Sequence, residues 1–229
     1  MSIKRIFFDS GEVLVRPRSG SWFYPQDYFD WIKEKKVPHF SIRQRMNEKK
    51  AVTKLLDRKF VRNNIEEYDL FLDFYSEVFS NVWKKDSQEL IQLCAKGKVY
   101  DNNEQVMFSD VEQTLNTLSG KFELSIISDA WPSLKQKYAS LGIIHHFEPF
   151  IISTLHGADK SGLDLFKKTL MLVDEKPEEC LFIDDRLDNL RRAASLGINC
   201  VHCSRYKKPR KSEFVSIKDF NTFDLVLKQ

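Results

Sequence analysis

The chain has 229 residues, which suits one large domain or one domain carrying a smaller insert. Hydrophobic residues make up 42% and charged residues 30%, so we expect a soluble protein with a sizeable core. The net charge of +3 comes from interleaved acids and bases, no apolar run approaches the length of a membrane span, and the N-terminus shows no signal peptide. These features disfavour nucleic-acid and membrane partners, and they make a cytoplasmic location the expectation.

The first predicted element is a buried strand that ends at Asp9. The apolar residues Ile6 to Phe8 are followed directly by Asp9, Ser10 and Gly11. A short apolar run is typical of a parallel strand covered on both faces, and open α/β sheets place their sites at the carboxyl ends of such strands. Asp9 is therefore a candidate site residue.

The segment from residue 17 to 98 contains no clear strand. Aromatic residues, lysines and glutamates recur in it at helical spacings, as do Phe71 and Tyr75. The segment is too long for an ordinary connection between a strand and a helix. We therefore predict a small helical domain over residues 17–98, inserted into an α/β core domain of residues 1–16 and 99–229. The alternative is that the segment is another part of the core.

Predicted strands and helices alternate from residue 99 onwards. Such alternation implies a doubly wound parallel sheet, so the predicted fold class is α/β with a Rossmann-type core. The predicted strands cover residues 122–128, 150–153, 180–184 and 199–203, with an edge strand at 214–217. The predicted helices cover residues 109–118 (beginning in a capping box formed by Ser109 and Glu112), 131–142, 163–172, 188–196 and 220–227.

Two local clusters are given structural interpretations. Cys200 and Cys203 resemble a metal or redox motif, but they lie in a predicted strand, where residues three apart face opposite sides. We expect both to be structural cysteines. The basic residues 207–211 are expected to form a solvated loop, and a phosphate-rich partner is the alternative.

Four polar signals follow one another along the predicted core: Asp9, Ser128, Lys160 and the pair Asp184–Asp185. A hydroxyl beside a helix N-terminus can anchor a phosphoryl group, carboxylates from different strands suit Mg²⁺, and a lysine offsets the remaining negative charge. In this interpretation Asp9 attacks phosphorus and forms an aspartyl-phosphate, which water then hydrolyses. The metal polarises the transferring group and holds it in line.

As a set, these residues resemble the motifs of the haloacid dehalogenase-like (HAD) hydrolase superfamily. The run from Ile6 to Leu14 resembles the first motif, Ser128 the second, Lys160 the third and residues 182–189 the fourth. The similarity covers the predicted core and is silent on the insert. In this family an insert directly after the first motif is a helical cap that closes over the site.

The resemblance implies a nucleophile and a metal site. Asp9 would be the nucleophile and a ligand of Mg²⁺, together with the backbone carbonyl of Gly11 and the carboxylate of Asp185. Asp184 and Asn189 would support the site directly or through water.

The resemblance also implies a phosphate-binding group. Ser128 would bind the phosphoryl oxygens, assisted by a backbone amide near Asp129 or Ala130. Lys160 would stabilise both the nucleophile and the phosphoryl group.

Two positions depart from the family pattern. Most family phosphatases carry an acid–base aspartate two residues after the nucleophile, where this chain has Gly11, and Ser161 replaces the usual proline after the lysine. Proton transfer to a leaving group contributes about 10²–10⁴-fold to a rate. The resemblance therefore leaves open a slow enzyme, a preference for good leaving groups, or an acid supplied by the cap, although some family phosphatases also have glycine here. Strand alternation is expected to aim the adjacent Glu12 elsewhere.

The sequence leaves three functions open. The favoured one is Mg²⁺-dependent hydrolysis of a small phosphorylated metabolite, with a sugar phosphate as the first guess. A second is C–P bond cleavage through a cap lysine; dehalogenation needs no metal and is disfavoured by the Asp184–Asp185 pair. A third is a non-catalytic phospho-ligand-binding protein, which Gly11 would permit but which has no use for a nucleophile.

The residues that set specificity are expected in the predicted cap. A cap that closes over the site favours a small molecule over a protein or nucleic acid, and closure would exclude water until the aspartyl-phosphate forms. Arg16 and Arg18 could reach a second anionic group or form a solvated hinge. Trp22, Phe23 and Tyr24 could line the pocket, although packing within the cap is the favoured interpretation.

Overall fold

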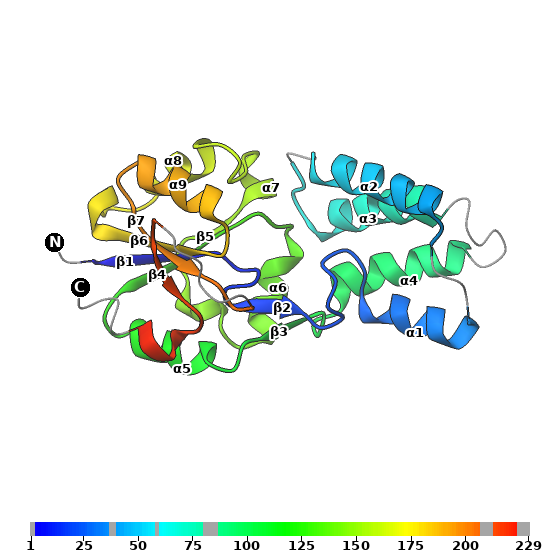
Figure 1. Cartoon of the computed structure of the whole chain (residues 1–229), viewed down its shortest axis with the longest axis horizontal. Helices are drawn as coiled ribbons and strands as arrows, with labels where there is room; N and C mark the ends of the chain where they lie inside the picture. Colours follow the sequence, from blue (N-terminus) through cyan, green and yellow to red (C-terminus); the bar gives the residue numbers. More distant parts are fainter. Residues whose placement is uncertain (1–2, 37–39, 58–59, 80–86, 207–212, 224–229) are drawn as a thin grey trace.

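The computed structural model describes residues 3–36, 40–57, 60–79, 87–206 and 213–223. Two groups of elements are visible in Figure 1. One is a sheet with helices on both faces, and the other is a group of helices beyond the end of the sheet opposite the N-terminus. None of the described helices is long and apolar enough to cross a membrane.

The sheet has six parallel strands in the order β5-β4-β1-β6-β7-β8. These are β1 (Arg5–Phe8), β4 (Glu123–Ser128), β5 (Phe150–Ile152), β6 (Cys180–Asp184), β7 (Asn199–Cys203) and β8 (Val215–Ile217). Strand β1 lies inside the sheet and all of its residues are buried, which explains why Ile6, Phe7 and Phe8 form an apolar run without alternation. The predicted parallel α/β fold, including the edge strand, is confirmed.

Helices cover both faces of the sheet. Figure 1 shows α8 (Asp164–Leu170) and α9 (Leu187–Ser195) on one side, and α5 (Val111–Leu118) and α6 (Ser133–Ser140) on the other. The short helix α7 (Ser153–His156) follows β5, and 3₁₀ turns span Ile144–His146, Pro177–Glu179 and Phe220–Thr222.

Each face of the sheet has its own apolar core, and residues on one strand divide between the two. In β1, Phe8 joins one core and Phe7 the other. In β7, Cys203 lies in the first core and Cys200 packs against the second, so the prediction that these cysteines face opposite sides is confirmed. All four cysteines are free thiols.

The second group, called the helical insert below, consists of α1 (Gln26–Lys35), α2 (Ile42–Leu56), α3 (Asn64–Phe79) and α4 (Ser87–Tyr100). It buries a separate, aromatic-rich core that includes Phe71, Tyr75 and Phe79. Tyr75 and Phe79 stack with their ring centroids 5.6 Å apart, one turn apart on α3. The predicted helical character of this segment is confirmed.

A small antiparallel pair of strands joins the insert to the core, and the sequence did not predict it. Strand β2 (Val15–Pro17) leads into the insert and pairs with β3 (Gln105–Met107), which leads out of it. Each strand has only three residues, too few for a periodic pattern to be recognised. The pair holds together, beside the end of β1, the two segments through which the chain enters and leaves the insert.

Two predictions near helix ends require correction. The predicted capping box of Ser109 and Glu112 is wrong, because Asp110 directly precedes α5 and no side chain caps this helix. The Asp110 carboxylate instead accepts two hydrogen bonds from Arg205 Nη1, at 2.8 and 2.7 Å, and one from the Phe220 amide at 2.6 Å. A charged, buried guanidinium is a stronger partner than a helix amide. The predicted closing helix begins as a 3₁₀ turn at Phe220–Thr222, and its residues from 224 onwards, like the basic residues 207–211, lie outside the described residues.

Candidate active site

Strand register brings the predicted polar residues to one edge of the sheet. In β1, Phe8 pairs with Ile126 of β4 on one side and with Ile183 of β6 on the other. Asp9 therefore follows the strand between Ser128, at the end of β4, and Asp184, at the end of β6. The chain order reverses across β1, which is where open α/β sheets form their binding crevice.

Three carboxylates meet at this edge. One oxygen from each of Asp9, Asp184 and Asp185 can be chosen so that all lie within 4.8 Å of one another. Burial, followed by the Asp184 and Asp185 charges, raises the pKa of Asp9 and outweighs the opposing effect of Lys160. Burial and Asp184 raise the pKa of Asp185 to about 6. The cluster thus concentrates negative charge that a cation would stabilise.

Lys160 is the buried cation of the site. Its side chain is 2% exposed, and Nζ lies 2.7 Å from Asp9 Oδ1 and 2.7 Å from Asp184 Oδ2. Burial alone would lower the pKa of Lys160, but the Asp184 and Asp9 carboxylates outweigh it and hold the pKa above its ordinary value. Lys160 is therefore a fixed positive charge beside Asp9.

Side chains around the cluster hold its loops in place. Asp129 accepts a hydrogen bond from the Lys160 amide at 2.9 Å, which fixes the lysine loop to the end of β4. Ser153 Oγ accepts one from the Ala130 amide at 3.1 Å. Of the two amides expected near Ser128, that of Ala130 is thus already engaged. Ser128 itself is buried and lines the pocket described below.

Asp184 is fully engaged in hydrogen bonds. Besides Lys160, it accepts from the Arg186 amide at 2.7 Å and from Asn189 Nδ2 at 3.0 Å. The structure thus places Asp184 and Asn189, for which the resemblance implies supporting roles, in direct contact with each other beside Lys160. Asp185, which is only half-buried, faces the pocket.

Trp22 occupies the space next to Gly11. A Cβ atom at position 11 would lie 3.1 Å from Trp22 Cζ2, and Trp22 Nε1 donates a hydrogen bond to Glu12 Oε1 at 2.8 Å. Glu12 has a positive φ of 58°, which turns its side chain into the pocket. The expectation that strand alternation would aim Glu12 elsewhere is wrong, because the chain has already left the strand at this point.

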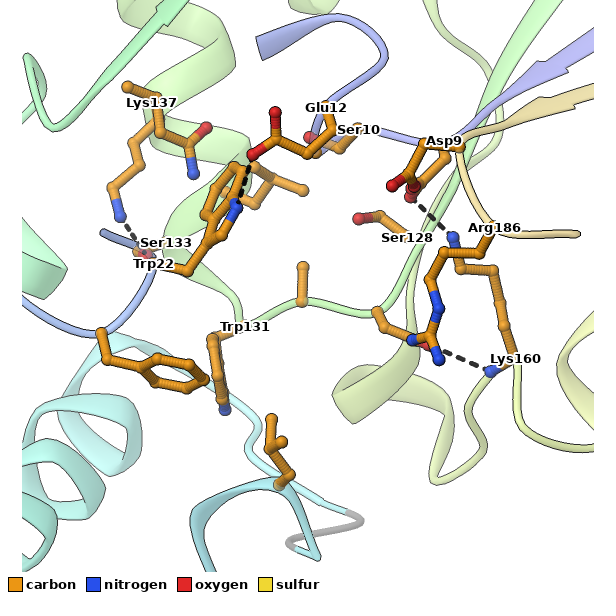
Figure 2. A pocket seen from close by; sticks show the side chains of 18 of the residues that line it. Asp9, Ser10, Glu12, Trp22, Ser128, Trp131, Ser133, Lys137, Lys160 and Arg186 are labelled. Atoms are coloured by element: carbon orange, nitrogen blue, oxygen red, sulfur yellow. Dashed lines mark hydrogen bonds and ion pairs between the residues drawn. The ribbon is translucent and has the colours of Figure 1, made fainter. Parts of the chain in front are cut away.

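These groups line a cavity of about 330 Å³ between the sheet edge and the helical insert. We call the part formed by Asp9, Ser128, Lys160 and Asp185 the near end. The far end is formed by Glu67, Lys98, Gln105, Ser133 and Lys137. In Figure 2, Lys137 and Ser133 lie across the pocket from Asp9 and Lys160, with Trp22 and Trp131 on either side of the space between.

The far end contains a buried ionic network. Glu67 accepts hydrogen bonds from the Ser133 amide at 2.8 Å and from Ser133 Oγ at 2.6 Å. Lys137 Nζ lies 3.4 Å from Glu104 Oε2 and donates to the Lys98 carbonyl at 2.7 Å, while Lys98 Nζ pairs with Glu104 Oε1. The network connects α3 and α4 of the insert to α6 of the core, and nothing in the local sequence indicates it.

Of the other residues that the sequence offered for substrate contact, some line the cavity and others do not. Trp22 and Phe23 line the cavity, whereas Tyr24 is buried in the insert core and donates to Glu48 at 2.7 Å. Packing within the insert was the favoured interpretation for all three. Phe23 both packs against the insert core and lines the cavity, whereas Trp22 lines the cavity and packs against the core of the sheet instead. Arg16 and Arg18 do not line the cavity; Arg18 donates to the Asn103 carbonyl at 2.7 Å beside the β2–β3 pair, consistent with the hinge alternative.

Comparison with known proteins identifies relatives in sequence and structure. A family model described as haloacid dehalogenase-like hydrolase matches residues 3–197. Similar solved structures include 2-haloacid dehalogenase from Pseudomonas syringae (16% identity, TM-score 0.68, 99% of this chain and 98% of that chain) and a HAD phosphatase from Thermococcus onnurineus (18%, 0.66, 98% of each). Another is the hydrolase YfnB from Bacillus subtilis, bound to magnesium (12%, 0.68, 100% of each). No curated protein sequence gives a significant match.

Proposed function

The chain belongs to the haloacid dehalogenase-like hydrolase family, and we propose that it is a Mg²⁺-dependent phosphatase that hydrolyses a small phosphorylated metabolite through an aspartyl-phosphate. The observation that carries the proposal is the cluster of Asp9, Asp184 and Asp185 around one fixed lysine. A dehalogenase that works without a metal has no use for a third carboxylate, Asp185, beside Asp9 and Asp184. The helical insert, over residues 17–98, would act as the cap of a core formed by residues 1–16 and 99–229.

The donor set fits a hard divalent cation. All three clustered side chains offer carboxylate oxygens, which Mg²⁺ prefers, and two carboxylates with several waters are its usual protein ligands. Because Asp184 is already occupied by Lys160 and Asn189, Asp9 and Asp185 would hold the ion with the carbonyl of Gly11. When bound, the ion would neutralise phosphoryl charge and polarise the transferring group.

The chain's own residues would carry the two displacement steps. Lys160 holds Asp9 Oδ1, which leaves Oδ2 to attack phosphorus while Ser128 and the Asp129 amide bind the phosphoryl oxygens. The bond from phosphorus to the leaving oxygen breaks, and that oxygen takes a proton from solvent water to leave as an alcohol. Water then attacks phosphorus and releases phosphate and the free Asp9 carboxylate.

The test is phosphate release from p-nitrophenyl phosphate, measured with Mg²⁺ and with EDTA, in the wild type and in Asp9→Asn. We expect release that requires Mg²⁺ and falls by more than about 10³-fold in the variant, as for loss of other covalent nucleophiles. Asp174→Asn, an exposed aspartate outside the pocket, is the matched control and should retain full activity.

Hydrolysis that survives in Asp9→Asn would show that the nucleophile assignment is wrong. Failure to release phosphate from any ester in the presence of Mg²⁺ would instead favour a non-catalytic protein that binds a phosphorylated ligand.

A further inference from the structure

The charges at the far end of the pocket cancel one another. Lys98 and Lys137 are matched by Glu104 and Glu67, and these four residues are each 4% exposed or less. Both lysines interact with Glu104, and their charges also act on Glu67. A carboxylate or a second phosphate on the substrate would therefore find its positive partners already neutralised, with two buried anions beside them.

The same wall has hydrogen-bonding capacity that the described residues do not use. An ammonium has three N–H donors, and among the described residues Lys98 Nζ has one hydrogen-bond acceptor, Glu104. Gln105, which follows Glu104 and is 7% exposed, has a buried Oε1 without a hydrogen-bond partner in the part of the chain that the structure describes. Buried polar groups are normally paired. The unpaired Oε1 of Gln105 and the unused N–H donors of Lys98 therefore point to a ligand that supplies the missing partners.

A hydroxyl group complements this wall. It can accept from Lys98 and donate to Gln105, whereas a carboxylate can only accept and an ammonium can only donate. Between the two ends, the indole rings of Trp22 and Trp131 and the ring of Phe23 present apolar surfaces on which a carbon chain can pack. The buried Trp131 Nε1 is a further donor that has no acceptor among the described residues.

We propose that the far end is a leaving-group subsite for an uncharged, polyhydroxylated alcohol, recognised by Lys98 and Gln105. This inference rests on the proposed function, because the near end must take the phosphoryl group for the alcohol to extend across the pocket. The substrates are then phosphate monoesters of polyols and sugars, rather than of hydroxy acids or bisphosphates.

The first test compares kcat/KM for three esters in Mg²⁺: ribitol 5-phosphate, n-pentyl phosphate and 3-phosphoglycerate. We expect ribitol 5-phosphate to exceed each of the others by at least about tenfold, the value of one or two hydrogen bonds. Equal values for ribitol 5-phosphate and n-pentyl phosphate, or a preference for 3-phosphoglycerate, would overturn the subsite.

The second test removes the unpaired acceptor. Gln105→Leu should lower kcat/KM for ribitol 5-phosphate at least about tenfold more than for p-nitrophenyl phosphate, whereas Gln92→Leu, an exposed glutamine on α4, should change neither. Equal losses on both esters would contradict the assignment. If Gln105→Leu fails to fold, Trp131→Phe removes an unpaired donor while keeping a ring, and the same selective loss is expected.

A binding measurement separates this inference from the proposed function. Calorimetric titration of the Asp9→Asn protein with ribitol 5-phosphate and with n-pentyl phosphate, both in Mg²⁺, reports on the subsite without turnover. Tighter binding of ribitol 5-phosphate would support the subsite even if the wild type hydrolyses nothing. Equal or absent binding would overturn it even if p-nitrophenyl phosphate is cleaved.

Discussion

The two ends of the pocket are built from different parts of the chain. The near end comes from the carboxyl ends of neighbouring parallel strands and the loop that carries Lys160, and its charged groups are bound tightly to one another. The far end comes from the insert helices, strand β3 and helix α6, and it balances its charges while leaving hydrogen-bonding atoms unpaired. If the proposed function holds, reaction chemistry and substrate selection reside at opposite ends of the pocket, which the following changes test.

Lys160→Met should have the largest effect. The change leaves the buried Asp9 and Asp184 without their cation, and breaking a buried pair costs about 3–5 kcal/mol of unfolding free energy. Turnover should fall by more than about 10³-fold, because the reacting group loses its fixed positive charge. Urea unfolding without Mg²⁺ and p-nitrophenyl phosphate assays measure both quantities. Lys167→Met, at an exposed position on α8, is the control; wild-type stability in Lys160→Met would contradict the ion-pair geometry.

Glu67→Leu should damage stability at the far end but spare the chemistry. The variant leaves the Ser133 amide and hydroxyl without an acceptor and unbalances the two lysines, at a cost of about 2–4 kcal/mol. Turnover of p-nitrophenyl phosphate should fall by less than about tenfold in folded protein, because no reacting group is touched. Glu67→Gln should recover part of the stability. A loss of turnover as large as that of Lys160→Met would show that the two ends are not separate.

The metal-free protein should lose stability as pH rises through the range in which Asp185 ionises. The folded-state pKa of Asp185 is about 6, above its ordinary value of 3.8. The stabilisation that the protonated Asp185 gives to the folded state is therefore present below pH 4 and is lost by about pH 6. The expected decrease in the free energy of unfolding is about 2 kcal/mol, a little below the full value of such a pKa shift because Asp185 is partly exposed. Asp185→Asn should make the profile less steep between pH 4 and pH 6, and Mg²⁺ should raise the melting temperature more at pH 8 than at pH 4.5. A flat wild-type profile would contradict this prediction.

Gly157→Ala should have the smallest effect. Gly157 has a φ of 62°, and a Cβ there would lie 2.0 Å from Cζ of Phe60, in the segment of the insert that contacts the core. In the same segment, the Val61 amide donates to the Thr154 carbonyl at 3.2 Å. We expect about 1 kcal/mol of destabilisation and a few-fold change in selectivity between esters. Gly142 has the same kind of strained φ, 76°, but open space around it. Comparing Gly157→Ala with Gly142→Ala therefore separates the effect of the Phe60 contact from that of the backbone strain. Identical selectivity in both variants would show that this contact does not position the far end.

Sequence reasoning identified the near end because each of its residues carries a local signal. Asp9 and Asp185 follow apolar strands, and parallel pairing then determines that they meet. The same reasoning failed at Glu12, which lies beyond the end of the strand at Phe8, because a positive φ there changes the direction of the side chain. It also predicted a capping box of Ser109 and Glu112 before α5, since nothing nearby in the sequence reveals that Asp110 pairs with Arg205 instead.

The far end could not be predicted in this way. Lys98 and Glu67 have the sequence context of ordinary surface residues on amphipathic helices, and only the packing of the insert against α6 buries them. Gln105 lies on a strand of three residues, too short to be recognised. Contacts between segments that are distant in sequence determine this wall, so no local pattern indicates it.

The position of Trp22 over Gly11 makes these two sites epistatic. Most phosphatases of this family carry an aspartate where this chain has Gly11, but here the indole ring stands 3.1 Å from the first atom of any such side chain. An acid at position 11 would require the indole ring to shift by a few tenths of an ångström or a smaller residue at 22, and a smaller residue at 22 releases Glu12 from its donor. A double-mutant cycle on Gly11→Asp and Trp22→Ala should therefore be non-additive. The effect of introducing an acid at position 11 in evolution would then depend on the residue that stands at position 22.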